Sequence, residues 1–334
     1  MSTGDRPRRG RRQAGFTFLE VTVAMALLSL MALVIERTLT TTNAAERYLA
    51  AVRRATERGQ KISYEIFDAV SSSRKLFQGD ATGDGYLGAL DLSRDPILSS
   101  ARLPLFDEIS DLGPDQVGDP RTGSVLLFVR ESDPAPCVAD ATTGKVRYID
   151  TYRFICVYPR QTNRRIVTGE TPMALDLVVW RSIPYPSYAQ IMAVEDPTER
   201  GSVVGDLYDR FGHDVAWDPN AAVDQAFHAL DNLGTVSSVA DPSPTIQEDP
   251  ESSSRGRLVY ANVQLARTVS SSYQRKGVFT LDDPSTWVPD GFEVKMTGAS
   301  GSRKIWIHLV VECQATRGST AVHANTMIAS TRDL

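Results

Sequence analysis

The sequence predicts an α+β protein in which a long amino-terminal transmembrane helix is followed by a globular domain of antiparallel β-sheet. Three observations support this prediction. Residues 16–35 form an apolar run, residues 43–70 keep apolar side chains at helical spacing, and beyond residue 95 short β-rich runs alternate with Pro, Gly, Ser and Asp.

Length and composition limit the class of protein before any motif is considered. The chain has 334 residues, 42% of them hydrophobic, which is enough for one large domain or two ordinary ones with a true core. Residues 1–15 hold five arginines against one aspartate, so the rest of the chain is more acidic than the net charge of −5. This acidity argues against nucleic-acid binding by the globular domain and is compatible with cation binding.

The apolar run, FTFLEVTVAMALLSLMALVI, has the length of a transmembrane helix. About twenty helical residues span a hydrocarbon core of roughly 30 Å. Because the arginines precede this run, the positive-inside rule places residues 1–15 in the cytoplasm and the bulk of the chain across the membrane. We therefore expect a leader over 1–15 and a helix over 16–78, of which 16–36 is the transmembrane part.

One carboxylate interrupts the apolar run. Glu20 is its fifth residue, and a charge within a membrane span costs about 2.5 to 3.5 kcal/mol at the centre, and less near an end, unless it is paired. Cleavage after Gly15 would create a positive amino group on Phe16, one helical turn from Glu20, where the helix dipole also favours a negative charge. The residues after the run, ERTLTTT, lack the small residues of an ordinary signal-peptidase site.

Gly15, Phe16 and the following T-F-L-E, behind an arginine-rich leader, resemble the class III signal of type IV pilins and type II secretion pseudopilins. The usual form is G-F-T-L-[IL]-E, and Phe18 replaces the commoner Leu. The resemblance implies a pilin-like fold, cleavage by a prepilin peptidase between Gly15 and Phe16, and N-methylation of Phe16. It also implies that Glu20 pairs with the Phe16 amine of its own or a neighbouring subunit. The alternative is an uncleaved signal anchor with a stray glutamate.

The helix is expected to continue beyond the membrane. Residues 43–70 are rich in helix formers, and Glu57 and Lys61 are placed for a favourable i,i+4 pair. Gly59 is a weak point where a long helix bends or ends. The alternative is two separate helices with a break near Thr40.

Residues 80–91, DATGDGYLGALD, match the pattern of a twelve-residue calcium-binding loop. The expected oxygen ligands belong to Asp80, Thr82, Asp84, Tyr86 (through its backbone carbonyl) and Asp91. The terminal Asp makes the pattern resemble the dockerin form of the loop. We therefore expect a structural Ca²⁺ ion in a loop over 79–95, and the alternative is an acidic surface turn without an ion.

The three cysteines, Cys137, Cys156 and Cys313, show no zinc-binding spacing. Any of three pairings could form a disulfide. The short loop between Cys137 and Cys156 favours that pair, particularly outside the cytoplasm. Three free, buried thiols are the alternative.

The globular head is expected over residues 96–334. Its clearest strands are 124–130, 145–160, 174–183, 257–269, 292–298 and 304–315. Segment 184–256 has the character of an insertion, in which Asp218, Pro219 and Gly234 predict the start and stop of a short helix. The order of a long helix and then a sheet resembles large PilW-like minor pilins and J-type pseudopilins.

No catalytic motif is present in the sequence. It lacks G-x-S-x-G, H-E-x-x-H and a dinucleotide fingerprint, and its four histidines show no metal-binding spacing. His213 beside Asp214 is typical of a loop, and His308 is expected to be a partly covered surface residue. We therefore expect a protein that is not an enzyme.

The resemblance implies a minor pilin or pseudopilin that initiates or caps a type IV pilus or type II secretion-like filament. Its partners would be other pilins or pseudopilins, a prepilin peptidase and the bacterial inner membrane. The carboxy-terminal domain would lie in the periplasm and then in a periplasmic or cell-surface filament. The insertion 184–256 motivates an alternative function, a filament-tip adhesin or ligand-binding module anchored by a pilin helix.

Overall fold

The computed structural model describes residues 17–94, 96–97, 101–107, 122–165, 173–250, 258–265, 291–298, 302–316 and 319–331. The packing divides the chain into two compact units, Met1–Leu49 and Ala50–Leu334. The second unit consists of helices and largely antiparallel sheets, so the predicted α+β, pilin-like fold class is confirmed.

Helix α1 (Phe18–Ser71) runs for 54 residues. The break considered near Thr40 does not occur, and Gly59 lies inside the helix as one of its buried residues. From Ala51 onward the buried residues recur every three or four positions, which gives α1 one core-facing stripe. The helix ends at Ser71 instead of residue 78, because the next residues pair as strand β1 (Ser73–Phe77).

Most of the described strands form one large sheet in the order β1-β3-β4-β5-β10-β12-β11-β2, with β13 paired to β12 and β6 to β4. Its other strands are β2 (Phe106–Asp107), β3 (Leu126–Asp140), β4 (Lys145–Arg165), β5 (Met173–Arg181), β6 (Tyr185–Pro186), β10 (Leu258–Leu265), β11 (Phe292–Thr297), β12 (Arg303–Thr316) and β13 (Ser319–Thr331). The strands that the sequence predicts are present, whereas β1, β2, β6 and β13 were not predicted.

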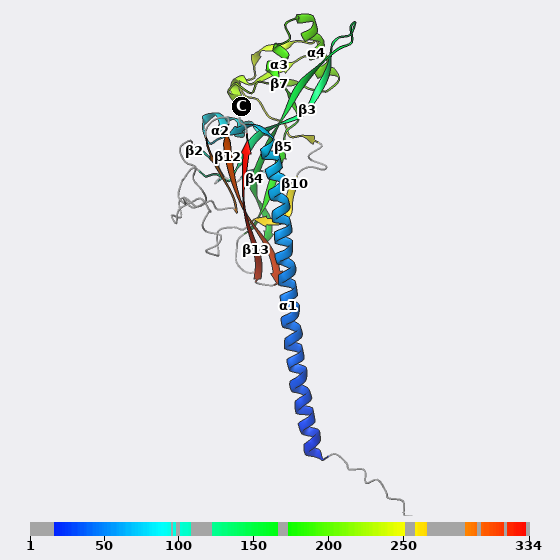
Figure 1. Cartoon of the computed structure of the whole chain (residues 1–334), viewed down its shortest axis with the longest axis vertical. Coiled ribbons are helices and arrows are strands. Elements are labelled where there is room, and N and C mark those ends of the chain that lie inside the picture. Colours follow the sequence, from blue (N-terminus) through cyan, green and yellow to red (C-terminus); the bar gives the residue numbers. More distant parts are fainter. Residues whose placement is uncertain are drawn as a thin grey trace, which may run out of the picture. The chain divides into compact units, whose positions relative to one another are not determined.

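The part of α1 from Ala50 onward packs against one face of this sheet (Figure 1). Its partners come from β3, β4 and β5 and also from β11, β12 and β13, which lie on the other side of β10 in the strand order. Leu76 on β1 and Ala329 on β13 belong to the same buried cluster. The sheet therefore curves around the helix and brings its two sides together.

The opposite face of the sheet carries an aromatic core. Its aromatic members are Phe77, Tyr86, Tyr152, Phe154, Tyr158, Trp180, Tyr185, Trp217 and Phe227. Tyr86 comes from helix α2 (Ala81–Ala89), and Trp217 and Phe227 come from β7 (Val215–Trp217) and β8 (Phe227–Leu230). Because these side chains share one cluster with Phe154 of β4, the segment that the sequence marks as an insertion is built into the head.

A small sheet and two helices make up the rest of that segment. The sheet has the order β7-β8-β9, with β9 at Val236–Ala240, and the helices are α3 (Tyr188–Met192) and α4 (Pro197–Asp209). Helix α4 packs on the outer part of β3 and β4 through Val203, Val204 and Leu207.

The helix predicted after Asp218 is wrong. The structure has a single 3-10 turn, η1 (Val223–Gln225), and then β8, which pairs with β7 and β9. The same Asp-Pro signature at Asp196 does start a helix, α4, where the Asp196 carboxylate accepts a hydrogen bond from Thr198 N at 2.9 Å. Strand pairing overrides the local helix signal after Asp218 but not after Asp196.

The predicted disulfide between Cys137 and Cys156 is also wrong, since all three cysteines are free and buried. In the β3–β4 ladder Cys137 lies opposite Arg147, whereas Cys156 lies opposite Leu127. Leu127 and Cys137 are separated by roughly 30 Å along the strand at about 3.3 Å per residue. A disulfide needs Cα atoms within about 7 Å, so the long ladder keeps the two thiols apart.

Candidate functional site

The first turn of α1 is closed by a capping box between Thr17 and Glu20. The backbone N–H of Thr17 donates to Glu20 Oε2 at 2.8 Å, and the Thr17 hydroxyl donates to the same oxygen at 3.0 Å. In return, Glu20 N donates to Thr17 Oγ1 at 3.4 Å. This reciprocal pattern is the one that T-x-x-E produces at a helix start. The signature stands in the sequence at 17–20, but the sequence interpretation assigned Glu20 only to the amino group of Phe16.

The capping box uses one oxygen of the Glu20 carboxylate. Both hydrogen bonds from Thr17 reach Oε2, and Oε1 makes no hydrogen bond to the residues that the structure describes. Thr17 follows the expected cleavage position, so the box does not depend on the leader. Glu20 is thus able to cap its own helix and keep Oε1 for a cation, such as an amino group. Gly15 and Phe16 lie outside the described residues.

The helix behind this turn has an apolar surface. Within the unit Met1–Leu49, all described residues of α1 are exposed. The large apolar side chains among them are Phe18, Leu19, Val21, Val23, Met25, Leu27, Leu28, Leu30, Met31, Leu33, Val34, Ile35, Leu39, Tyr48 and Leu49. By length and composition, α1 meets the requirement for crossing a membrane. An exposed apolar surface of this extent marks a membrane or protein contact.

The two hydroxyl side chains between Phe18 and Ile35 bond to their own helix. Thr22 Oγ1 donates to Phe18 O at 2.7 Å, and Ser29 Oγ donates to Met25 O at 2.9 Å. Hydroxyls bonded to the preceding turn need no water, so they are compatible with an apolar surrounding.

The segment expected to form a calcium loop is a helix. Residues 81–89 are α2, and Asp80 is its N-cap, with Oδ1 accepting from Gly83 N at 2.8 Å. Side chains two residues apart on a helix point about 200° apart, so Thr82, Asp84 and Tyr86 do not converge as they would in a loop.

The side chains of Tyr86 and Asp91, two residues of the expected loop, have other partners. Tyr86 is fully buried, accepts a hydrogen bond from Trp217 Nε1 at 3.2 Å, and has a pKa raised to about 12 by burial. Asp91 Oδ1 accepts from Ser93 Oγ at 2.7 Å. Within the described part of the chain, no group of three or more His, Cys, Asp or Glu side chains is placed to hold a metal ion. Calcium binding stays an untested prediction, without the loop geometry that suggested it.

His213, His228 and His308, the histidines whose side chains the structure describes, are all buried. His308, expected near the surface, is buried, and its Nδ1 lies 2.9 Å from Thr326 Oγ1. Burial lowers the pKa of His308 to about 4 and also lowers that of His213. His228, buried as well, stacks on Tyr188 with ring centroids 3.7 Å apart.

Comparison with known proteins assigns only the amino-terminal part of the chain. Residues 10–35 match the family model described as the prokaryotic N-terminal methylation motif. No curated protein and no solved structure matches the chain significantly. The matched residues contain the predicted cleavage position, the capping box and most of the exposed apolar surface.

Proposed function

Because the chain carries the amino-terminal methylation motif of the type IV pilin and pseudopilin class, we propose that it is a minor pilin or pseudopilin. It is a structural subunit of a type IV pilus or type II secretion-like filament. A prepilin peptidase cuts between Gly15 and Phe16, and the new amino group of Phe16 is methylated. The observation that carries the proposal is the exposed apolar helix that begins directly behind the motif with a carboxylate in its first turn.

In this proposal the apolar surface of α1 contacts lipid before assembly and neighbouring subunits after it. It first lies in the inner membrane, with the head in the periplasm because the arginine-rich leader stays in the cytoplasm. It then packs against the helices of neighbouring subunits, which replace lipid by apolar side chains. Van der Waals packing and polar pairs drive such an exchange, since lipid and apolar side chains are equally dry.

Glu20 sets the register of that packing. A carboxylate in an apolar surrounding is costly unless a cation meets it, so the amine of a Phe16 at the correct height is favoured over other positions. The capping box orients the carboxylate for this contact through Oε2 and leaves Oε1 for the amine. The size of the head suits a low-copy subunit that initiates or caps the filament, because a bulky head packs poorly in every turn of a thin fibre.

Two substitutions at Glu20 separate its two roles. In Glu20→Gln the side chain still accepts from Thr17, but the charge is lost, whereas Glu20→Ala loses both. We expect both variants to insert in the membrane and to be absent from sheared or purified filaments, as measured by immunoblotting. Wild-type incorporation of Glu20→Gln would show that Glu20 acts only as a helix cap and would remove the register role.

One observation favours a second function, binding by the segment 184–256. Leu233 and Val239 in the β8–β9 region are 82% and 74% exposed. Deleting the segment is no test, because it would remove Trp217 and Phe227 from the aromatic core. The double variant Leu233→Ser, Val239→Ser leaves that core intact. Normal filaments that no longer attach to surfaces would support an adhesin, and unchanged attachment would exclude these side chains as the adhesive surface.

A further inference from the structure

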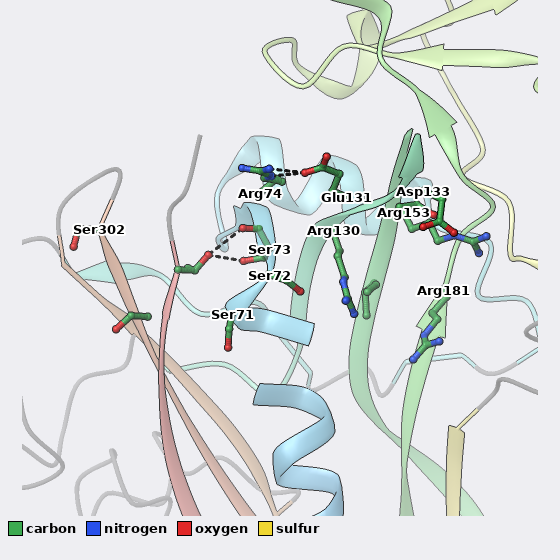
Figure 2. Close-up of a pocket in the computed structure, with 14 residues that line it drawn as sticks. Ser71, Ser72, Ser73, Arg74, Arg130, Glu131, Asp133, Arg153, Arg181 and Ser302 are labelled. Atoms are coloured by element: carbon green, nitrogen blue, oxygen red, sulfur yellow. Dashed lines mark hydrogen bonds and ion pairs between the residues drawn. The ribbon is translucent and has the colours of Figure 1, made fainter. Parts of the chain in front are cut away.

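A cavity of about 940 Å³ opens where helix α1 ends, inside the unit Ala50–Leu334 (Figure 2). Its wall comes from the α1–β1 junction, from β3, β4 and β5, and from the opposite side of the curved sheet. The lining residues that matter here are Arg74, Arg130, Arg153, Arg181, Ser132 and Ser302. This cavity has no part in the proposed filament function.

Three of these arginines continue the sheet face that α1 covers. Side chains two residues apart on a strand share a face. Arg130 is two residues from Phe128 on β3, Arg153 is two from Ile155 on β4, and Arg181 is two from Val179 on β5. The floor under the helix is therefore apolar up to Val70 and becomes basic where the helix stops.

This arrangement places like charges close together. Arg130 and Arg153 are directly opposite each other in the β3–β4 ladder, and Arg181 lies opposite Ile155 in the next ladder. Like charges facing each other across strands destabilise a sheet. A negative group in the cavity would relieve that repulsion.

The arginines differ in how far the protein already neutralises them. Arg74 pairs with Glu131 at 2.5 Å, and Arg153 pairs with Asp249. Within the described part of the chain, the one carboxylate that Arg130 reaches is the exposed Asp68, at 4.0 Å. Among the residues that the structure describes, Arg181 forms no ion pair and no side-chain hydrogen bond, and its Nε is buried without a partner. Leaving such a donor unsatisfied costs about 1 to 3 kcal/mol.

The carboxyl end of α1 does not account for the positive charge of these arginines. Cations stabilise the negative end of a helix, which is the structural explanation for arginines at this place. However, Ser71 Oγ already donates to Phe67 O at 2.5 Å, and Ser72 Oγ donates to Asp68 O at 3.0 Å. The last turn is thus capped by serine hydroxyls, and Arg181 is not needed to cap it.

We propose that this cavity binds a small multivalent oxyanion, either a phosphate compound or a di- or tricarboxylate, with Arg181 and Arg130 as its charge partners. A guanidinium offers two parallel N–H donors that match the oxygens of such groups. Ser132 and Ser302 add hydroxyl groups, and the cavity volume is within the usual range for small-molecule sites. The lining also contains two carboxylates, that of Glu131, which pairs with Arg74, and that of Asp133.

The lining also argues against two classes of ligand. Among the lining residues that the structure describes, Ile155 is the one apolar residue and none is aromatic, so neither an apolar ligand nor a sugar ring that stacks on an aromatic face has a matching surface there.

Calorimetric titration of the full chain in detergent, with inorganic pyrophosphate and with citrate at constant ionic strength, tests this proposal. Arg181→Gln removes the unpartnered guanidinium, and Arg53→Gln is the matched control, because it removes the same charge from an exposed site on α1. We expect binding to the parent and to Arg53→Gln, and at least tenfold weaker binding to Arg181→Gln. Preference for pyrophosphate or for citrate assigns the ligand class. No binding to the parent, or equal binding to Arg181→Gln, overturns the proposal.

Thermal unfolding without added anion separates binding from a structural role. Because Arg181 has an unsatisfied buried donor, Arg181→Gln is expected to melt at or above the temperature of the parent. Arg181→Lys, which keeps the charge and loses the parallel N–H donors of the guanidinium, is expected to bind the anion with intermediate affinity. Should Arg181→Gln fail to fold, Arg130→Gln replaces it in the titration, and parent-like binding by that variant would contradict the site.

Discussion

Ser73 and Thr331 are 258 residues apart in the sequence, yet their hydroxyl oxygens lie 2.7 Å apart in a buried hydrogen bond. The Thr331 hydroxyl also lies 3.2 Å from the backbone carbonyl of Ser73. These contacts join β1 to β13, at the two sides of the sheet that encloses the second part of α1. Figure 2 shows them beside the end of the helix.

Thr331→Val tests the importance of this closure. Valine keeps the shape of threonine and removes the hydroxyl, which leaves the buried Ser73 Oγ without this partner. We expect a loss of about 1 to 3 kcal/mol in the free energy of unfolding, measured by urea denaturation. The exposed neighbour Ser330→Ala serves as the control and should change stability by less than about 0.5 kcal/mol. Equal stability of both variants would show that the sheet is closed by apolar packing alone.

The cysteines should behave as three buried thiols. Burial raises the pKa of Cys137 to about 12 and also raises that of Cys156, so neither is a reactive thiolate at neutral pH. We expect slow modification by a thiol reagent in the native protein and three equivalents after unfolding in denaturant without reductant. One equivalent in the unfolded protein would instead reveal a disulfide and contradict the β3–β4 register.

Asp80 should act as a helix cap. Asp80→Ala removes the acceptor for Gly83 N and should cost about 1 kcal/mol, whereas Asp80→Ser, which retains a capping oxygen, should cost little. The effect of Asp80→Ala is expected with and without Ca²⁺, as measured by thermal unfolding in calcium and in chelator. A calcium-dependent rise in melting temperature that Asp84→Ala abolishes would restore the calcium site predicted from the sequence.

His308 should make stability depend on pH. Its pKa falls from 6.5 to about 4 because burial disfavours the charged ring. The unfolded chain therefore takes up a proton first, and the stability that neutral His308 contributes is present above pH 6.5 and is lost as the pH falls toward 4. The loss amounts to about 3 kcal/mol and should be absent in His308→Gln. An NMR titration that gives His308 a pKa above 6.5 would show that Glu293, opposite it on β11, dominates instead.

Much of the fold could be predicted because local patterns and tertiary structure agree there. The apolar spacing before Val70 and the β-rich runs of β3, β4 and β12 reappear as the helix and the sheet. The structure differs from the prediction where strand pairing determines the secondary structure. Residues 73–77 continue a helical composition but pair with β3, and the segment after Asp218 pairs with β7.

The candidate sites divide in the same way. Glu20 and its capping partner Thr17 lie within four residues, so the sequence contains the whole arrangement. The arginine-lined cavity was not predicted, because Arg130, Arg153 and Arg181 meet only through the register of three strands. The loop expected around the calcium pattern is not formed for the opposite reason, since residues 81–89 match a loop by composition and fold as a helix.

The central claim is that this chain is processed as a pilin-like precursor, and the mass of its mature amino terminus tests that claim most directly. After co-expression with a prepilin peptidase, we expect the amino-terminal peptide to begin at Phe16 and to carry one added methyl group. The matched variant Gly15→Leu should keep its leader. An intact Met1, or a mature chain that starts anywhere other than Phe16, would contradict the account.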